Sequence, residues 1–239
     1  KRFLNWERLM KLRRTVFFLA SVVCIALPAT AALAQAPAAN GAPYTPSPGQ
    51  FGKDVIWLPT AESLVDRMLD MAKVTPQDFV MDLGSGDGRT VITAAKRGAT
   101  AMGVEYNPDM VELSKANAAK ENVSAKATFV KADLYETDFS KATVITMFLL
   151  PEINVKLRPK VLNLKPGTRV VSNSFTMEDW EADQTETISG ECTSWCTALL
   201  WIVPAKVEGA WQMPGGPLTL TQKFQVVTGT LGSAAISNG

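Results

Sequence analysis

The chain has 239 residues, of which 46% are hydrophobic and 20% are charged, with a formal net charge of +1. This length suits one globular domain with appendages, and the apolar share excludes a disordered chain. The sequence contains no histidine, which excludes His-based triads, a histidine general base and the common zinc hydrolases.

Residues 1–34 predict a secretion signal preceded by a few upstream residues. A basic stretch that includes Lys11 precedes the apolar run Val16–Leu27, and small residues follow up to Ala34. This order is typical of a signal peptide that is cleaved after Ala34, and it predicts a periplasmic or secreted protein. An uncleaved membrane anchor over residues 15–34 is the alternative, because that segment just reaches the length of a membrane span.

Without residues 1–34 the chain loses six basic residues and one acidic residue, so its formal net charge becomes −4. A mildly acidic domain without a Lys/Arg cluster binds nucleic acid poorly, so we expect no nucleic-acid partner. Two cysteines remain, Cys192 and Cys196, which either form a small disulfide loop in an oxidising compartment or stay thiols. We expect no metal site, because there is neither a second cysteine pair nor a histidine.

Residues 35–53 are rich in Pro, Ala and Gly and predict an extended linker, and residues 54–183 predict the main domain. Its first helix is expected over Ala61–Lys73, with Thr60 as the N-cap. Apolar runs of strand length then alternate with helical patterns. Strands are predicted over 79–83, 101–105, 127–133, 141–150 and within 166–175, and helices over 89–97, 107–122 and 154–162.

This alternation predicts βαβ units in a Rossmann-like α/β fold, with a doubly wound and mainly parallel sheet. Such sheets bind ligands at the carboxyl ends of their strands. After Trp180 the pattern changes to a period of two, so residues 184–239 predict a C-terminal antiparallel β extension. Its last residues, SAAISNG, show no terminating element, which is consistent with a truncated chain. Trp201 and Trp211 are interpreted as core residues or as a recognition surface.

A glycine-rich loop follows the first predicted strand, with Gly84, Gly86 and Gly88 in the stretch MDLGSGDGRT. Such glycines let the backbone approach a ligand, and the following helix start offers free N–H groups to an anion. A dinucleotide fingerprint would need a third glycine where Arg89 stands. Asp82 is a poor neighbour for a pyrophosphate, but it suits a ligand that carries an ammonium group.

Two further acids end the next two predicted strands. Glu105 lies about 20 residues after the loop, where an acid can accept hydrogen bonds from ribose hydroxyls. Asp133 is placed to accept from an adenine amino group. Together with Asp82 and the loop, these acids predict a site for S-adenosylmethionine. The alternative is that Glu105 and Asp133 only cap turns or helices.

These segments resemble the class I S-adenosylmethionine-dependent methyltransferases. The stretch DLGSGDGRTVITAAKRGATAMGVEYNPDMVELS, with residues 57–60 and 148–180, is most similar to protein-lysine methyltransferases of archaeal and mitochondrial type. The resemblance covers Val55–Asp183 and implies the class I fold. It implies cofactor contacts at Thr60, Asp82, Gly84, Ser85, Gly86, Gly88, Glu105 and Asp133. It implies that the methyl acceptor is bordered by Phe148, Leu149, Pro151 and Glu152.

The resemblance predicts methyl transfer to a protein lysine. Relatives often have Tyr where this chain has Phe148 and His where it has Asn173. The methyl donor is already activated, so alignment is the main task and no histidine is needed. No catalytic base is assigned; Glu152 is the nearest candidate, and an acid of a helix start is the favoured interpretation. The alternatives are an exported non-catalytic module with the same fold and a small-molecule methyltransferase. The oligomeric state is not predicted, and a membrane partner is expected only for an uncleaved leader.

Overall fold

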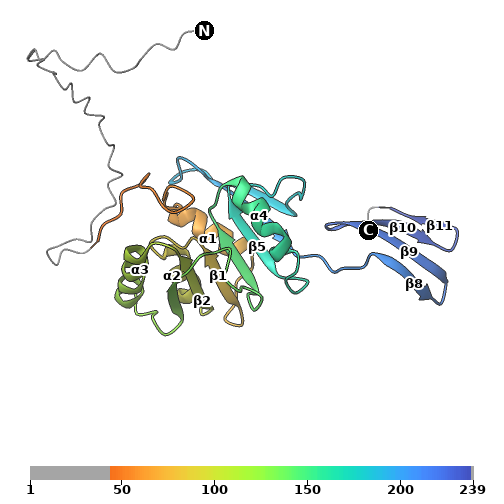
Figure 1. The fold of residues 1–239 in the computed structure, drawn as a ribbon, viewed down its shortest axis with the longest axis horizontal. Helices are drawn as coiled ribbons and strands as arrows, with labels where there is room; N and C mark the ends of the chain where they lie inside the picture. The colour runs from red at the N-terminus through yellow and green to blue at the C-terminus, as the bar shows by residue number, and fades with distance from the viewer. Residues whose placement is uncertain (1–43, 238–239) are drawn as a thin grey trace, which may run out of the picture. The chain divides into compact units, whose positions relative to one another are not determined.

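The computed structural model describes residues 44–237, so the predicted signal and most of the predicted linker lie outside the described residues. The described chain contains a seven-stranded mixed sheet and a separate four-stranded antiparallel sheet. Figure 1 shows the helices beside the larger sheet. No helix within residues 44–237 is long and apolar enough to cross a membrane.

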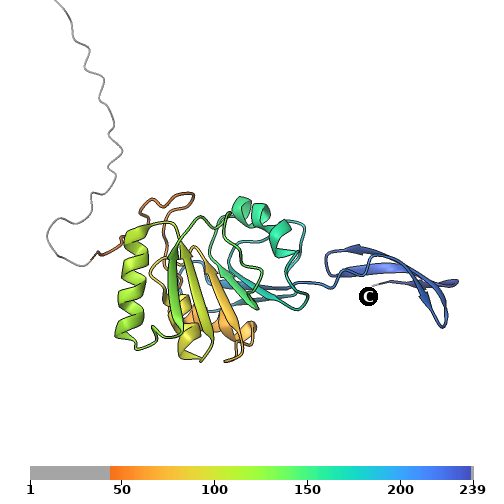
Figure 2. The same cartoon turned by 60° about the horizontal axis from the view of Figure 1, so that its bottom comes forward.

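The larger sheet contains the five parallel strands that the sequence predicts. They are β1 (Phe79–Leu83), β2 (Thr100–Glu105), β3 (Ala127–Lys131), β4 (Val144–Met147) and β5 (Arg169–Asn173). The strand order is β3-β2-β1-β4-β5-β7-β6, and Figure 2 shows strands of this sheet side by side. The chain leaves the β3 edge and returns beside β1, so the carboxyl ends of β1 and β4 flank the switch point where ligands bind. The predicted Rossmann-like class is confirmed.

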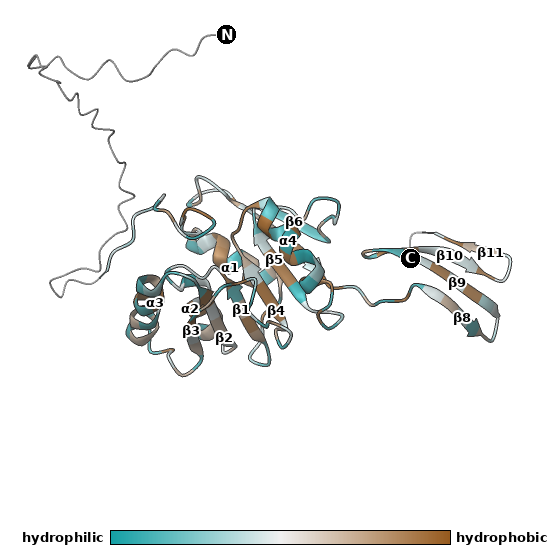
Figure 3. Ribbon diagram, viewed as in Figure 1, coloured by the Kyte–Doolittle hydropathy of each residue, from teal (hydrophilic) through white to brown (hydrophobic). Residues whose placement is uncertain are grey.

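In the described part of the chain, four helices cover the two faces of this sheet. They are α1 (Glu62–Met71), α2 (Arg89–Lys96), α3 (Pro108–Lys120) and α4 (Pro151–Val161). Buried residues of α1, α2 and α3 share one apolar cluster, whereas those of α4 belong to a second cluster on the other face. Because both faces are covered, the central strands are rich in apolar residues, and β4 is mostly brown in Figure 3.

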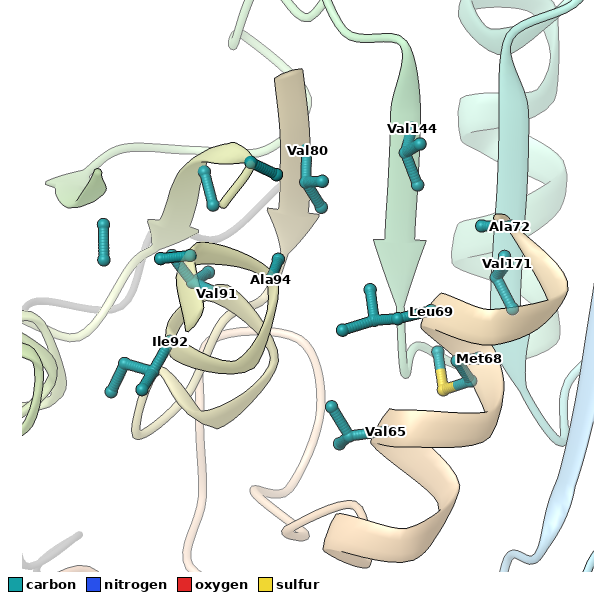
Figure 4. Close-up of a cluster of buried hydrophobic side chains, with 14 of the residues drawn as sticks. Val65, Met68, Leu69, Ala72, Val80, Val91, Ile92, Ala94, Val144 and Val171 are labelled. Carbon is teal, nitrogen blue, oxygen red and sulfur yellow. The ribbon is translucent and has the colours of Figure 1, made fainter. Parts of the chain in front are cut away.

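Strand alternation divides the core between these two clusters. Val80 and Val144 belong to the first cluster, whereas Met81 and Ile145, one position later on the same strands, belong to the second. Figure 4 shows Val80 and Val144 beside Leu69 of α1. Leu69 is completely buried. Burial of such a side chain contributes about 1.5–3 kcal/mol, so this packing helps to hold α1 against the sheet.

Two predicted helix starts are corrected by the structure. The N-cap of α1 is Ala61, which makes no side-chain capping bond, so the prediction of Thr60 as N-cap is wrong. Helix α4 begins at Pro151, three residues before the predicted start at Asn154. Proline is tolerated in a first turn because its missing N–H would have no partner there. Asn154 is buried, and its side-chain amide donates to backbone carbonyls of the segment that follows β5.

The predicted domain boundary at residue 183 cuts through the larger sheet. Strand β7 (Thr197–Ile202) pairs antiparallel with β5, and β6 (Gln184–Thr187) pairs with β7. The four residues Ala198–Trp201 are buried. An apolar strand buried on both faces has to lie inside the main sheet, which is why this part of the predicted extension belongs to the main domain.

The remaining strands form the second sheet. They are β8 (Gly209–Met213), β9 (Gly216–Lys223), β10 (Val226–Leu231) and β11 (Ala234–Ile236), paired antiparallel in chain order. Strand β11 lies in the stretch for which the sequence predicts no element. Trp201 is completely buried in β7 and donates a hydrogen bond to the carbonyl of Trp180, whereas Trp211 in β8 is 48% exposed. Trp201 is therefore a core residue, and the interpretation of both tryptophans as one recognition surface is wrong.

Candidate functional site: a pocket at the carboxyl ends of β1–β4

A pocket lies where the glycine loop, residues 50–60, the ends of β2 and β3 and the segment after β4 meet. Six of the loop and strand-end residues that the sequence predicts for the cofactor line it, and so does Thr60. The lining residues among the predictions are Thr60, Asp82, Gly84, Ser85, Gly86, Glu105, Asp133, Phe148 and Leu149. Gly88, Pro151 and Glu152 do not line it.

Gly86 and Gly88 serve two different purposes in the loop. Gly86 has φ +52°, and a Cβ there would lie 2.5 Å from Nε1 of Trp57, so the indole packs directly on the loop backbone. Gly88 has φ +85°, and its Cβ would lie 2.8 Å from the Phe129 ring and 2.9 Å from Cβ of Ser114. Gly88 therefore lets the loop pack on β3 and α3 and does not face the ligand space.

Ser85 is buried, and its Oγ has no hydrogen-bond partner among residues 44–237. This hydroxyl lies over Gly103 of β2, where a Cβ would come within 2.4 Å of it. A buried hydroxyl without a partner costs free energy, so it is available to a ligand or a water molecule. The geometry fits the predicted role of Ser85 in the loop.

Arg89 stands where a dinucleotide fingerprint would have its third glycine. Its side chain connects the glycine loop to the segment that precedes α1. Its Nη2 donates to Oδ2 of Asp87 at 2.6 Å, and its Nη1 donates to the carbonyl of Thr60 at 2.7 Å. The Thr60 hydroxyl accepts a hydrogen bond from Nδ2 of Asn173, at the end of β5, at 3.2 Å. Thr60 is therefore held at the pocket by two contacts, one from Arg89 to its carbonyl and one from the Asn173 amide to its hydroxyl.

Asp82 ends β1 and is only 6% exposed. Its Oδ1 accepts a hydrogen bond from Oγ1 of Thr146 at 2.7 Å. Burial raises the pKa of Asp82 to about 7; repulsion from Glu105 and Asp87 adds to this rise, and the bond from Thr146 opposes it. No Lys or Arg within residues 44–237 forms an ion pair with Asp82. A buried carboxylate that lacks a cationic partner fits a ligand that brings its own ammonium group.

Glu105 clamps the loop to the start of α3. Its Oε2 accepts from the backbone N–H of Gly86 and its Oε1 from that of Asn107, both at 2.9 Å. Asn107 is the N-cap of α3, and its side chain accepts from the N–H groups of Asp109 and Met110. Glu105 therefore does support a helix start, and its carboxylate also lines the pocket with lone pairs that ribose hydroxyls can reach.

Asp133 makes an ion pair that the sequence does not predict. Its Oδ2 accepts from Nζ of Lys53 at 2.6 Å, and its Oδ1 accepts from the N–H of Tyr135 at 2.9 Å. The hydrogen bond between the two charged groups lowers the pKa of Asp133 and raises that of Lys53. The Lys53 ammonium also lies 5.1 Å from the ring centre of Tyr106 and 5.6 Å from that of Tyr135.

Lys53 is carried by a hairpin in what the sequence describes as the end of a linker. The N–H of Gly49 donates to the carbonyl of Trp57 at 2.8 Å, and Phe51 pairs with Ile56. Lys53 and Asp133 are 80 residues apart, and no local motif connects them. The stretch Trp57–Thr60 was the only sequence signal that this segment belongs to the site, because it is one of the segments that carry the resemblance.

The other side of the pocket is apolar. Phe148 and Leu149 follow β4 and line the same pocket as the residues at the ends of β1, β2 and β3 that the sequence predicts for the cofactor. Leu149 is 2% exposed, and Phe148 is half-buried. Glu152 is exposed in the first turn of α4, where a carboxylate is favoured by the helix dipole. This position fits the interpretation of Glu152 as an acid of a helix start.

Comparison with known proteins shows similarity to methyltransferases. The profile of the family called ANTKMT methyltransferase domain matches residues 82–184. A protein-lysine N-methyltransferase of Saccharolobus islandicus is 49% identical over 129 residues, which are 53% of this chain and 80% of that protein. The adenine nucleotide translocase lysine N-methyltransferase of Mus musculus is 34% identical over 119 residues, which are 49% of this chain and 52% of that protein.

A solved structure agrees in fold. It is described as an RNA methyltransferase from Salinibacter ruber in complex with S-adenosyl-L-homocysteine. The TM-score is 0.59 at 43% identity, and the match covers 63% of this chain and 96% of that one. On these grounds the chain belongs to the class I S-adenosylmethionine-dependent methyltransferases, in the family of the archaeal and mitochondrial protein-lysine methyltransferases.

Proposed function

We propose that this protein transfers a methyl group from S-adenosylmethionine to the side-chain amine of a protein lysine. The observation that carries the proposal is that one pocket combines two features. The buried carboxylate of Asp82, which has no cationic partner, lines it together with an apolar wall formed by Phe148 and Leu149. The names of the relatives from Saccharolobus islandicus and Mus musculus add support for lysine as the acceptor.

The chain's part in the reaction is to bind and to align. In this proposal Asp82 pairs with the ammonium of the donor, Glu105 accepts from its ribose and Asp133 accepts from its adenine, and all three line the pocket. The donor supplies a methyl group on a positively charged sulfur, which needs no further activation. Alignment of the two reactants can contribute about 7–11 kcal/mol to the lowering of the barrier.

The acceptor amine has to be neutral when it attacks the methyl carbon. The nitrogen forms a bond to that carbon, the carbon–sulfur bond breaks toward sulfur, and the proton leaves the nitrogen for solvent or a base. The apolar wall of Phe148 and Leu149 disfavours the ammonium form of a lysine that lies against it. This desolvation lowers the pKa of the acceptor lysine and raises the fraction that can react.

RNA is the rival acceptor, since the solved structure at 43% identity is described as an RNA methyltransferase. One assay separates the possibilities. Purified protein is incubated with methyl-labelled S-adenosylmethionine and, in parallel, with the protein, RNA and small-molecule fractions of one cell extract. We expect label in the protein fraction, recovered as methyl-lysine after hydrolysis. Label that appears only in RNA or in small molecules would overturn the lysine assignment, and no label in any fraction would favour a non-catalytic module.

Two variants make the assay specific to the pocket. Asp82→Asn removes the buried carboxylate that we propose as the partner of the donor's ammonium, and we expect it to lose transfer. Asp138→Asn changes an exposed acid that does not line the pocket, and we expect it to transfer like the parent protein. Equal activity of both variants would show that the label comes from another enzyme in the preparation.

We also propose that the protein is exported. The Cys192–Cys196 disulfide supports an oxidising compartment, in line with the signal predicted over residues 1–34. Fractionation of the producing cells tests this proposal: a shortened chain in the periplasm or medium is expected for a cleaved signal. A full-length chain in the membrane fraction would point to an anchor instead, and one in the cytosol would contradict export.

A further inference from the structure

Three aromatic side chains form one cluster beside the pocket, which we call the aromatic platform: Phe148, Phe175 and Trp195. The ring centres of Phe148 and Phe175 are 5.9 Å apart, those of Phe148 and Trp195 are 6.2 Å apart, and those of Phe175 and Trp195 are 5.1 Å apart. Each ring is therefore at contact distance from the other two, and the three rings form one aromatic cluster.

The platform continues the acceptor side of the pocket. Phe148 follows β4, Phe175 follows β5, and Trp195 precedes β7. The N–H of Ser174 donates to the carbonyl of Thr197 at 2.7 Å, which places both flanking residues at the carboxyl end of β5. The cofactor residues stand at the ends of β1, β2 and β3, so donor and platform occupy opposite halves of one sheet edge. Phe148 belongs to both the platform and the pocket lining.

Trp195 reaches this place through a closed loop. The Cys192–Cys196 disulfide closes the connection between β6 and β7, and Trp195 is the residue before the second cysteine. Its φ of +58° lies in the left-handed region, which bulky residues rarely adopt. Such a conformation persists only where the surrounding structure imposes it, and such sites are often functional. Trp195 nevertheless stays 47% exposed, so one face of the platform is open to solvent.

We propose that the aromatic platform binds the methylene stem of the acceptor lysine, and that the disulfide maintains this binding by holding Trp195 in place. The inference rests on the proposed function. A lysine side chain carries four methylenes that pack along apolar surfaces, and the exposed aromatic rings of the platform offer such a surface. A stem that lies along Trp195 and Phe175 leads past Phe148 into the pocket, where the donor methyl group is presented.

This placement predicts a particular kinetic effect. The platform contacts the stem in the same way before and during methyl transfer, because the stem does not react. Loss of such uniform binding raises the KM of the acceptor and leaves kcat unchanged. Affinity for S-adenosylmethionine also stays constant, since Trp195 does not line the pocket.

Trp195→Ala is the first test, with Trp211→Ala as its matched control. Trp211 is 48% exposed but lies on β8 of the second sheet. The control substitution therefore removes an equally exposed indole from another place. Initial rates of methyl-lysine formation are measured against increasing concentrations of the acceptor protein fraction, at saturating donor. We expect a five- to twentyfold higher half-saturating concentration for Trp195→Ala, an unchanged limiting rate, and parent behaviour for Trp211→Ala. Trp195→Phe, which keeps a ring, should recover most of the loss.

Reduction of the disulfide is the second test. Dithiothreitol is expected to raise the half-saturating concentration of the parent protein but not that of Trp195→Ala, because the indole is already absent. Cys192→Ser/Cys196→Ser should resemble the reduced parent. If the parent transfers methyl to lysine but Trp195→Ala and the reduced protein match it, the platform inference is wrong and the proposed function stands. If the parent forms no methyl-lysine at all, the proposed function fails and takes the inference with it.

Discussion

The Asp82 carboxylate accepts a hydrogen bond from the Thr146 hydroxyl at 2.7 Å across the β1–β4 pair, where the two residues are register partners. This contact is buried, and it is at the switch point of the sheet. Burial raises the pKa of Asp82 to about 7. The carboxylate is therefore poised to ionise when a cation enters the pocket.

Binding of S-adenosylmethionine should weaken as the pH falls below 7. Protonated Asp82 cannot pair with the donor's ammonium, and its pKa is about 7. Isothermal titration at pH 8 and pH 6 should give an affinity about tenfold lower at pH 6, the value expected for one proton per pH unit below the pKa. An affinity that does not change between these two pH values would show that Asp82 is not the ammonium partner.

Asp82→Asn should stabilise the fold while it abolishes donor binding. A folded-state pKa of about 7, above the usual carboxyl value, means that the ionised side chain destabilises the fold at pH 8. The destabilisation is of the order of 4 kcal/mol and disappears as the pH falls from 7 toward 4. Urea unfolding at pH 8 and pH 5 measures it. A variant that is less stable than the parent at pH 8 would contradict this assignment.

Lys53→Ala should bind S-adenosylmethionine a few-fold more tightly than the parent protein. Lys53 occupies Oδ2 of Asp133 and lies over the rings of Tyr106 and Tyr135, beside the acid assigned to the adenine. Donor binding then has to displace the ammonium or share the carboxylate with it. Titration calorimetry with Lys131→Ala, an exposed lysine at the end of β3, as control would measure the change. Weaker binding by Lys53→Ala would mean that Lys53 helps to hold the donor.

Arg169→Ala should destabilise the fold without a change in donor affinity. Arg169 pairs with the buried Asp78 and donates to the carbonyl of Ala72, at the opposite end of the strands from the pocket. Burial alone would raise the pKa of Asp78, but the bonds from Arg169, Thr143 and Thr75 outweigh it and lower the pKa. Loss of one partner of such a pair costs about 3–5 kcal/mol in unfolding free energy.

The pH dependence of the stabilisation by the Arg169–Asp78 pair provides a control for this prediction. Because the pKa of Asp78 is lowered, its stabilising effect is complete above the usual carboxyl value and fades as the pH falls below it. The stability difference between the parent and Arg169→Ala should therefore shrink in acid. A large loss of donor affinity in Arg169→Ala would show that this end of the sheet is coupled to the pocket.

The parallel half of the fold was predictable because its signals are local. Each strand from β1 to β5 is an apolar run beside a helical pattern, and Asn107 with Pro108 marks the start of α3. Alternation of such elements limits the topology to a few right-handed arrangements. The acids of the pocket were predictable for the same reason, since each stands at or just after the end of a predicted strand.

The features that were missed depend on contacts between distant residues. Strand β7 looks like any other β-like segment in sequence, and only its pairing with β5 places it in the main sheet. The Lys53–Asp133 pair and the Asn173–Thr60 bond join residues 80 and 113 positions apart. Gly88 shows the converse: its place in the motif suggests ligand contact, but Phe129 and Ser114 beneath it require a residue without a side chain.

The most direct measurement is a calorimetric titration of the purified protein with S-adenosylmethionine, repeated with Asp82→Ala, Glu105→Ala and Asp138→Asn. The pocket at the carboxyl ends of β1–β4 predicts micromolar binding by the parent and by Asp138→Asn, and none by the two pocket variants. Absence of binding by the parent, or undiminished binding by Asp82→Ala, would contradict the assignment of this pocket to the methyl donor.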